Sequence, residues 1–216
     1  MRGRKRRGFG RRRHVAGSRN DTRMIYTEKI RRAVKFSIKT HEVYQKQKRK
    51  GKDIAYITHP LTVGLILARA GASEDVIVAG ILHDTIEDSI EEKKVTRGMI
   101  VERFGEAAAS LVSDVTEHDR VLPWEARKRE ALSHIAHFSH DALLLKSADI
   151  LSNGTELVDD HARHGDVIFA HFHAPKDKML GHQLEAISAL IDRWPESPLA
   201  GDLQDLSDRL RAMSEL

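Results

Sequence analysis

Apolar residues recur at helical spacing along most of this chain, and no stretch of any length alternates with the period of two that is typical of a half-buried strand. Serine, threonine or proline precedes several of these stretches, and glycine follows some of them, as expected of helix starts and stops. The sequence therefore predicts an all-α, single-domain helical bundle with short connections. The expected helices are Met24–Gln47, Thr58–Ala70, a segment after Ser73 that carries His83 and Asp84, Thr96–Phe104, Glu106–Thr116, Pro123–His137, Asp141–Leu151, Pro175–Arg193 and Ala200–Met213.

The bulk composition excludes several classes of protein. A chain of 216 residues with 40% apolar and 31% charged residues is typical of one soluble globular domain. The absence of cysteine excludes disulfides, thiolate zinc sites and cysteine nucleophiles. The longest apolar run is too short to span a membrane, and no signal peptide is visible. We therefore expect a cytoplasmic protein with no membrane partner.

The first 20 residues contain eight arginines, one lysine and no acidic residue. Without these nine positive charges, 27 basic residues face 32 acidic ones, so the rest of the chain carries about −5. A segment of this composition is expected to be disordered. It is an arm for RNA, ribosomes or anionic surfaces, or else a solvated extension or the result of a misassigned start codon. We expect a basic tail at 1–22, one domain at 23–195, and a C-terminal helix at 196–216 packed on that domain.

A charged motif ends the most apolar of the expected helices. The run Val76–Leu82 is followed by His83 and Asp84, and one turn later by Glu87 and Asp88. At 3.6 residues per turn, His83 stacks on Glu87, and Asp84 stacks on Asp88. Unpaired charge at the edge of a core helix costs several kcal/mol. A divalent metal ion is the natural compensation.

Two further residues extend this motif to a candidate metal site. Thr58 is expected to cap a helix that His59 opens, and Asp149 lies within the apolar run Leu143–Leu151. Two imidazoles and two carboxylates suit Mn²⁺, Fe²⁺ or Zn²⁺ with open positions for water, and suit structural zinc poorly. Taken alone, the histidine is an ordinary helix start and the aspartate is a buried residue satisfied by the backbone. The ordered set is much less expected by chance.

Several ordered motifs carry a resemblance that spans roughly residues 25 to 160. The chain resembles the HD superfamily of metal-dependent phosphohydrolases, and within it the hydrolase domain of RelA/SpoT-type proteins and the stand-alone small alarmone hydrolases. The motifs are Tyr56-Ile57-Thr58-His59-Pro60, Leu82-His83-Asp84-Thr85-Ile86-Glu87-Asp88, Phe104-Gly105, Val115-Thr116, Leu122-Pro123 through Arg127-Lys128-Arg129, and Leu145-Lys146-Ser147-Ala148-Asp149.

This resemblance implies an all-α fold of the HD-domain type and a complete metal site. The implied ligands are His59, His83, Asp84 and Asp149, with manganese as the usual ion. The implied activity is removal of the 3′-pyrophosphate from guanosine 3′,5′-bisdiphosphate or its pentaphosphate form. In such chemistry the metal lowers the pKa of a bound water and draws charge from a phosphoryl oxygen.

The resemblance also implies roles for residues around the metal. Glu87 and Asp88 match an acidic pair that orients or deprotonates the attacking water; alternatively they form a solvated helix end. Lys48 and Arg49 match a basic pair at the nucleotide; alternatively they belong to an ordinary solvated charge run. Asn153 matches an asparagine whose amide is expected to bond base, sugar or a ligand carboxylate.

Some positions depart from the family pattern and leave the substrate open. Ile150 and Thr155 stand where the family commonly has basic residues. One alternative is therefore a phosphohydrolase for another nucleotide, such as a nicotinamide cofactor 2′-phosphate or a nucleoside phosphate. Another is a non-catalytic, nucleic-acid-associated protein, which the arginine tail suggests. Five histidines between residues 161 and 182 form either a second metal site or, as their irregular spacing favours, a set of surface histidines.

Overall fold

The computed structural model describes residues 26–117 and 121–214, so the basic tail expected at 1–22 lies outside the described residues. The described chain is helical, with no strand in it beyond one isolated bridge between Lys48 and Ala55, and the all-α prediction is confirmed. The α-helices are α1 Glu28–Ile38, α2 Thr58–Arg69, α3 Glu74–Leu82, α4 Thr85–Asp88, α5 Arg97–Phe104, α6 Glu106–Val115, α7 Trp124–Ile135, α8 His140–His164, α9 Lys176–Arg193 and α10 Ala200–Ser214. One π-helix, η1 Lys39–Tyr44, and two 3₁₀ segments, η2 Glu91–Lys93 and η3 Gly165–His171, complete the order.

Helix starts follow the local sequence closely. Several helices begin after a serine or threonine whose hydroxyl accepts a hydrogen bond from the backbone N–H three residues later. These residues are Thr27, Ser73, Thr96 and Ser139. Thr58 does not have the expected capping role, because its hydroxyl donates to the carbonyl of Ala55 at 2.9 Å and the residue is the first of α2.

The first expected helix, Met24–Gln47, is interrupted. α1 ends at Ile38, and the chain continues as the π-helix η1 before it enters a loop at 45–57. The hydroxyl of Thr40 donates to the carbonyl of Phe36 at 3.1 Å, a bond that bends helices. Lys46 then adopts φ 52°, which turns the chain back towards η1. Single π-turns are frequent at functional sites.

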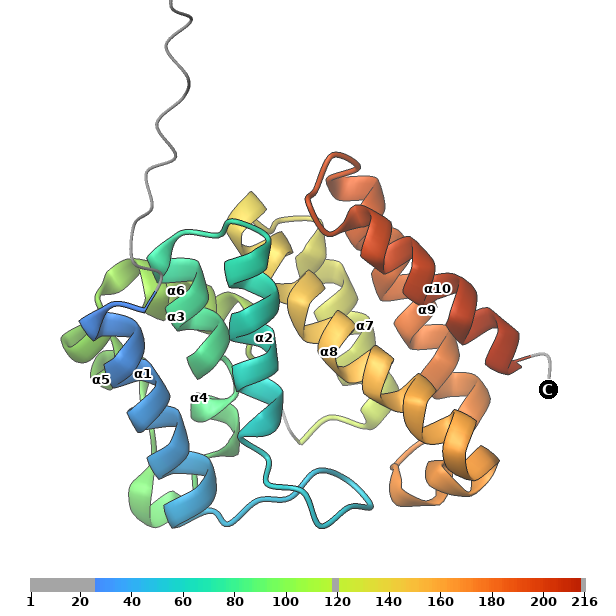
Figure 1. Ribbon diagram of the computed structural model, residues 1–216, viewed down its shortest axis with the longest axis horizontal. Helices are drawn as coiled ribbons and strands as arrows, with labels where there is room; N and C mark the ends of the chain where they lie inside the picture. The colour runs from blue at the N-terminus through green and yellow to red at the C-terminus, as the bar shows by residue number, and fades with distance from the viewer. Residues whose placement is uncertain (1–25, 118–120, 215–216) are drawn as a thin grey trace, which may run out of the picture.

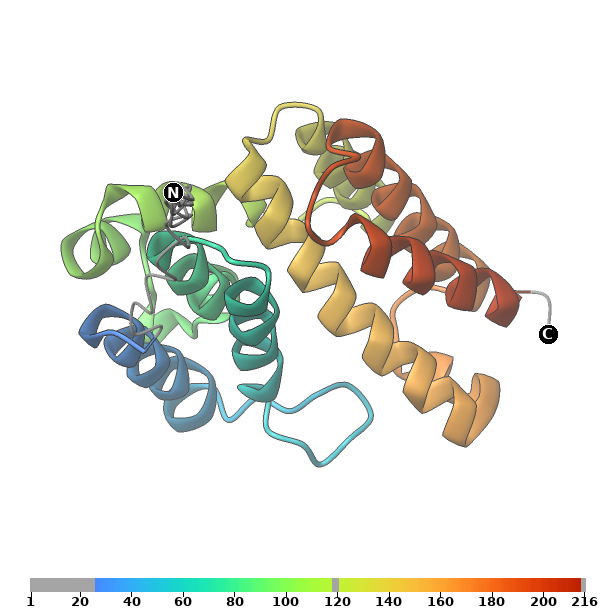
Figure 2. The same cartoon turned by 45° about the horizontal axis from the view of Figure 1, so that its top comes forward.

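The long helix α8 lies across the middle of the molecule and joins its two sides (Figures 1 and 2). It contacts α2, α3 and α6 on one side, and α9 and α10 on the other. The helix was expected to end near Leu151 but continues to His164. α10 packs against both α8 and α9.

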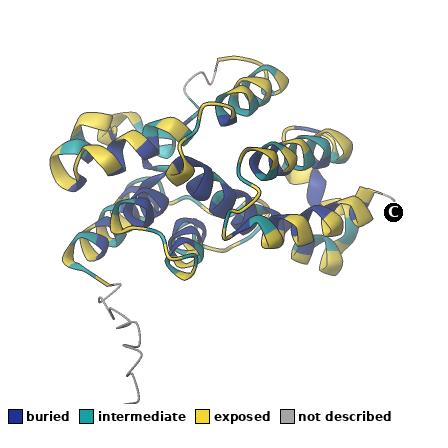
Figure 3. Cartoon of the chain, turned by 90° about the horizontal axis from the view of Figure 1, so that it is seen from above, coloured by how far each residue is buried: buried dark blue, intermediate teal, exposed yellow. Residues whose placement is uncertain are grey.

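The core is centred on α3, in which every residue from Val76 to Leu82 is buried (Figure 3). A Cβ at Gly80 would lie 2.3 Å from Leu67, so the glycine permits the close approach of α2 to α3. Within the described residues, no helix combines the length and the apolar character that crossing a bilayer requires.

Candidate metal centre

The four predicted ligands converge from separate helices. His59 is the second residue of α2, His83 and Asp84 lie between α3 and α4, and Asp149 is in α8. The two Nε2 atoms of the histidines are 3.2 Å apart. Two ligand atoms that share a cation at about 2.1 Å lie about 3.0–3.4 Å apart. The separation of the imidazoles therefore matches a shared ion.

Both carboxylates reach the same point. Asp149 Oδ1 lies 3.3 Å from His59 Nε2 and 3.7 Å from His83 Nε2. Asp84 Oδ2 lies 3.5 Å from His59 Nε2 and 3.2 Å from His83 Nε2. The side chains of both histidines are at most 4% exposed. The structure thus places all four predicted ligands in one buried cluster.

The orientation of each imidazole is fixed by a contact to Nδ1, the ring nitrogen that faces away from the cluster. His83 Nδ1 donates to the backbone carbonyl of Gly80 at 2.8 Å, which leaves the Nε2 lone pair directed at the cluster. His59 Nδ1 lies 2.9 Å from the hydroxyl of Ser152. Metal-bound histidines are held by such contacts to their remote nitrogens. Two facing imidazole nitrogens with two carboxylates beside them fit a divalent cation in this donor set.

The two carboxylates are also held in place. Asp84 Oδ2 accepts a hydrogen bond from the hydroxyl of Tyr56 at 2.5 Å, and Asp149 Oδ2 lies 2.9 Å from Lys146 Nζ. Burial raises the pKa of Asp149, but the charge of Lys146 and bonds from the two histidines outweigh it, and the pKa lies well below its usual value. Asp149 therefore remains ionised and available as a ligand.

The helix that carries the motif breaks between His83 and Asp84. Thr85 donates its hydroxyl to the carbonyl of Leu82 at 2.7 Å, and His83 bonds the carbonyl of Gly80, so side chains bond the last carbonyls of α3. The expected stacking is retained for Asp84 and Asp88, whose backbone O and N are 2.9 Å apart. His83 and Glu87 do not share a helix, because α3 ends at Leu82, with His83 as its C-cap, and Glu87 lies in α4.

A cavity of about 340 Å³ contains the site. It is lined by His83, Asp84, Asp149, Asn153 and Glu87 among other residues. A neighbouring cavity of about 520 Å³ is lined by both predicted acidic residues, Glu87 and Asp88. Glu87 therefore shares a cavity with three of the predicted ligands, whereas Asp88 lines only the neighbouring cavity.

Asp88 is anchored through a glutamine that sequence reasoning missed. Gln47 Nε2 donates to Asp88 Oδ2 at 3.0 Å, and Gln47 Oε1 lies 3.2 Å from Nδ1 of the fully buried His41. Burial lowers the pKa of His41, which favours the neutral ring. The π-helix η1 supplies His41, and the reversal at Lys46 brings Gln47 back to it. The sequence did not single out Gln47 or His41, because neither residue belongs to a charged motif.

The predicted nucleotide-binding residues take different positions. Arg49 is 11% exposed, and its Nη2 donates to Asn153 Oδ1 at 2.8 Å. Asn153 Nδ2 donates in turn to Asp149 Oδ1 at 2.8 Å, so its amide bonds a ligand carboxylate. Lys48 is 54% exposed, pairs with Asp53 at 3.0 Å and is not among the residues that line the 340 Å³ cavity.

Lysines beyond the predicted pair of Lys48 and Arg49 also line this cavity, namely Lys50, Lys52, Lys128 and Lys146. Lys146 stands three residues before Asp149 in α8, a helical spacing that the sequence contained. Lys128 comes from α7, and both it and Arg127 pair with Glu117, at 2.5 and 3.0 Å. Only the fold brings α7 to the site.

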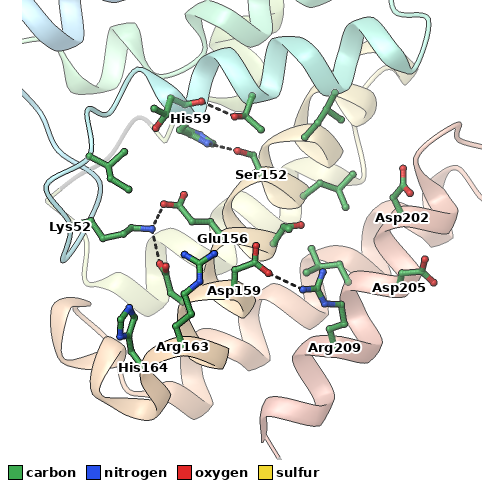
Figure 4. Close-up of a pocket in the computed structure, with 18 residues that line it drawn as sticks. Lys52, His59, Ser152, Glu156, Asp159, Arg163, His164, Asp202, Asp205 and Arg209 are labelled. Atoms are coloured by element: carbon green, nitrogen blue, oxygen red, sulfur yellow. Dashed lines mark hydrogen bonds and ion pairs between the residues drawn. The ribbon is translucent and has the colours of Figure 1, made fainter.

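A groove larger than the metal cavity lies next to it. This groove of about 780 Å³ runs between α2, α8 and α10, and Figure 4 shows Lys52 and Glu156 at its edge. His59 is the one predicted ligand that also borders this groove. The groove and the metal cavity share Lys52, Glu156 and Asp160.

The late histidines stand apart from the metal centre. His161 Nε2 lies 2.8 Å from Asp166 Oδ1. Among the residues that the structure describes, none of the histidines at 161–182 joins a group of three potential metal ligands. His173 and His182 line the 520 Å³ cavity together with Glu87 and Asp88, and His182 is half-buried, so the surface interpretation does not hold for every late histidine.

Comparisons with known proteins agree with this geometry. The family model for the HD domain matches residues 33–178. The chain is 36% identical over 130 residues to the guanosine-3′,5′-bis(diphosphate) 3′-pyrophosphohydrolase MESH1 of Xenopus tropicalis, covering 59% of this chain and 69% of that protein. It is 37% identical over 130 residues to the guanosine-3′,5′-bis(diphosphate) 3′-pyrophosphohydrolase of Aquifex aeolicus, 59% of this chain but 18% of that protein.

Solved structures share the fold. A metazoan ortholog of SpoT, described as hydrolysing ppGpp, superposes with a TM-score of 0.68 at 23% identity, covering 87% of this chain and 98% of its own. The protein lmo0812 of Listeria monocytogenes EGD-e superposes with a TM-score of 0.65 at 28% identity, covering 73% of this chain and 99% of its own. Because the family model for the HD domain covers more than half of its length, the chain belongs to the HD domain family.

Proposed function

We propose that this protein is a metal-dependent pyrophosphohydrolase that removes the 3′-pyrophosphate from guanosine 3′,5′-bisdiphosphate. The observation that carries the proposal is the convergence of His59, His83, Asp84 and Asp149 beside a cavity lined by cations. Relatives that cover the same part of the chain bear the name of this activity. A polyanionic substrate would meet five cations around this acidic site, namely Arg49, Lys50, Lys52, Lys128 and Lys146.

The metal ion would be held by the four side chains, whose mixed nitrogen and oxygen set suits Mn²⁺, Fe²⁺ or Zn²⁺. Manganese is proposed because the resemblance to the alarmone hydrolases implies it. A divalent ion in this place supplies a more acidic water and withdraws charge from a phosphoryl oxygen. The remote contacts of the imidazoles and carboxylates keep these ligands directed at one point.

The protein's own residues have separate tasks. Glu87 borders the cavity and is placed to orient the attacking water or to accept its proton. Lys50, Lys128 and Lys146 line the same cavity and would neutralise phosphate charge. Burial lowers the pKa of Lys146, but the charge of Asp149 outweighs it and raises the pKa above its usual value, so this lysine stays cationic.

The two departures from the family pattern lie away from the metal cavity. Ile150 is 8% exposed and belongs to the core, and Thr155 faces the groove between α2, α8 and α10. Neither lines the 340 Å³ cavity. These positions therefore give no reason to prefer another nucleotide over the bisdiphosphate.

A nucleotide panel tests the proposal. The full chain with Mn²⁺ is offered guanosine 3′,5′-bisdiphosphate, a nicotinamide cofactor 2′-phosphate and a nucleoside monophosphate, and phosphate and pyrophosphate are quantified separately. We expect pyrophosphate from the first substrate and little turnover of the others. Release of single phosphates alone, or RNA binding without any metal-dependent turnover, would contradict the proposal.

A further inference from the structure

Two cations of the loop 45–57 are already paired with carboxylates of α8. Arg49 Nε donates to Glu156 Oε2 at 2.9 Å, and Arg49 Nη2 contacts the same oxygen. Lys52 Nζ contacts Glu156 Oε1, as Figure 4 shows. The same atom lies 2.6 Å from Asp160 Oδ2. Both oxygens of Glu156 are therefore occupied by cations from the loop.

The carboxylate of Glu156 occupies a position next to the metal centre in which the anionic group of a ligand would bind. Two N–H groups of one guanidinium on one carboxylate use the same donors that grip a phosphate. The guanidinium also bonds Asn153, which bonds the predicted ligand Asp149. Burial raises the pKa of Glu156, but hydrogen bonds from Arg49 and Lys52 outweigh it, and its pKa lies below the usual value. The carboxylate is thus a fixed negative charge at neutral pH.

We propose that Glu156, assisted by Asp160, is a specificity-determining residue that competes with substrate phosphate for Arg49 and Lys52. This inference rests on the proposed function, because it concerns the same cavity. In the free protein the loop cations are neutralised, and a ligand must displace the carboxylates to reach them. A phosphate group carries about −1.5 to −2. A diphosphate can replace the lost ion pairs, whereas a weakly charged ligand cannot.

If the ion pairs between the loop and α8 only held the loop in place, Glu156 would not compete with a substrate. Other contacts, however, also hold the loop. Gly51 packs so closely on η3 that a Cβ there would lie 2.5 Å from the ring of His171. Lys50 Nζ lies 5.3 Å from the ring centre of Phe172. At its base, Tyr56 N donates to Gln47 O at 3.0 Å. Removal of one charge on α8 therefore leaves the loop supported.

The test uses Glu156→Gln, which keeps the size of the side chain and an oxygen for Arg49 but removes the charge. Binding of inorganic pyrophosphate to the full chain is measured by calorimetry at fixed Mn²⁺ and ionic strength. We expect the dissociation constant to fall by about fivefold or more, the scale of one ion pair. The KM for guanosine 3′,5′-bisdiphosphate should fall by a similar factor, with kcat within about twofold.

Asp159→Asn is the matched control, because it removes the same charge from the adjacent residue of α8. Asp159 pairs with Arg209 of α10 at 3.1 Å, away from the loop (Figure 4). Its dissociation constant for pyrophosphate should stay within about twofold of the original. Asp160→Asn is the second test and should give a smaller gain than Glu156→Gln.

Several results would overturn the inference. Unchanged or weaker pyrophosphate binding by Glu156→Gln would show that the carboxylate only holds the loop, and an equal gain in Asp159→Asn would show a general effect of charge. Failure of the proposed function gives a different pattern. A protein that gains pyrophosphate affinity in Glu156→Gln but never hydrolyses the nucleotide would support the competition and contradict the proposed activity.

Discussion

The metal centre and the loop 45–57 border the same cavity but are built on different principles. The ligands lie in or directly beside packed helices, and the imidazoles are held by a backbone carbonyl and a buried hydroxyl. The loop instead holds its cations by ion pairs with Glu156 and Asp160. The first arrangement fixes a geometry, whereas the second holds charges that a ligand can exchange. Substitutions should therefore separate metal retention and chemistry from substrate affinity.

The largest effect is expected at the metal centre. Asp84→Ala removes one of four ligands from a buried site, and we expect loss of bound metal and of turnover while the helices persist. Metal analysis, circular dichroism and a hydrolysis assay measure the three properties. Asp75→Ala is the control, since Asp75 is 39% exposed, pairs with Lys29 and lies in the first turn of α3, at the other end of that helix from His83. Turnover at the original rate in Asp84→Ala would disprove the site assignment.

A smaller effect should separate chemistry from metal binding. Glu87→Gln retains the four ligands but cannot accept a proton, so kcat should fall by about 10²-fold or more with metal content unchanged. Glu92→Gln, an exposed residue of η2, provides the control. A Glu87→Gln enzyme with normal kcat would assign the acidic role elsewhere, with Asp88 as the next residue to test.

The contact between Gln47 and Asp88 is expected to have a still smaller effect. Gln47→Leu removes the donor at 3.0 Å from Asp88 Oδ2, so the carboxylate should lose its orientation. We expect kcat to fall by about tenfold with KM little changed. Gln204→Leu, which loses an exposed bond to Asp208 in α10, should leave both constants unchanged. A change in KM alone would place Gln47 with the substrate loop rather than with the acidic pair.

Substitution of Glu117 should change the free energy of unfolding more than the affinity for substrate. Burial raises its pKa, but the charges of Lys128 and Arg127 outweigh it and hold the pKa below the usual value. Its stabilisation, about 1 kcal/mol, is thus present above the unfolded pKa of about 4.3 and is lost as the pH falls through the folded pKa. Urea unfolding of Glu117→Gln at pH 7 should show this deficit, and the difference should shrink at pH 3. A pH-independent difference would point to packing instead.

The smallest effect is expected from the basic tail. Deletion of residues 1–20 removes nine positive charges but no predicted site residue, so kcat and KM should stay within about twofold. The shortened protein is compared with the full chain in the hydrolysis assay and in RNA binding at two salt concentrations. Loss of hydrolysis on deletion would connect the tail to the metal centre.

Sequence alone supplied the parts of the site that depend on residue type and helix order. His59, His83, Asp84 and Asp149 were predicted because each stands at a helix start, a helix end or inside an apolar helix. The structure brings the imidazole of His59 within 3.3 Å of the carboxylate of Asp149, although 90 residues separate them. Periodicity cannot show such pairing, and it was inferred from the family resemblance.

The omissions have physical causes. In the loop, the reversal at Lys46 makes spacing uninformative, and the direction of Lys48 and Lys50 depends on tertiary contacts. α8 was expected to end at Leu151, but it continues past Gly154, where a Cβ would lie 2.6 Å from Leu206. That glycine serves the close packing of α10 and does not end the helix.

The bond from His83 to the main-chain carbonyl of Gly80 bears on how the metal centre tolerates mutation. No side-chain substitution can delete this acceptor, because it belongs to the backbone of α3. Its position nevertheless depends on a residue without a side chain, since any larger residue at 80 would collide with Leu67. The contact between Gly80 and Leu67 has no role in the chemistry. A substitution at Gly80 would nevertheless misalign the imidazole of His83.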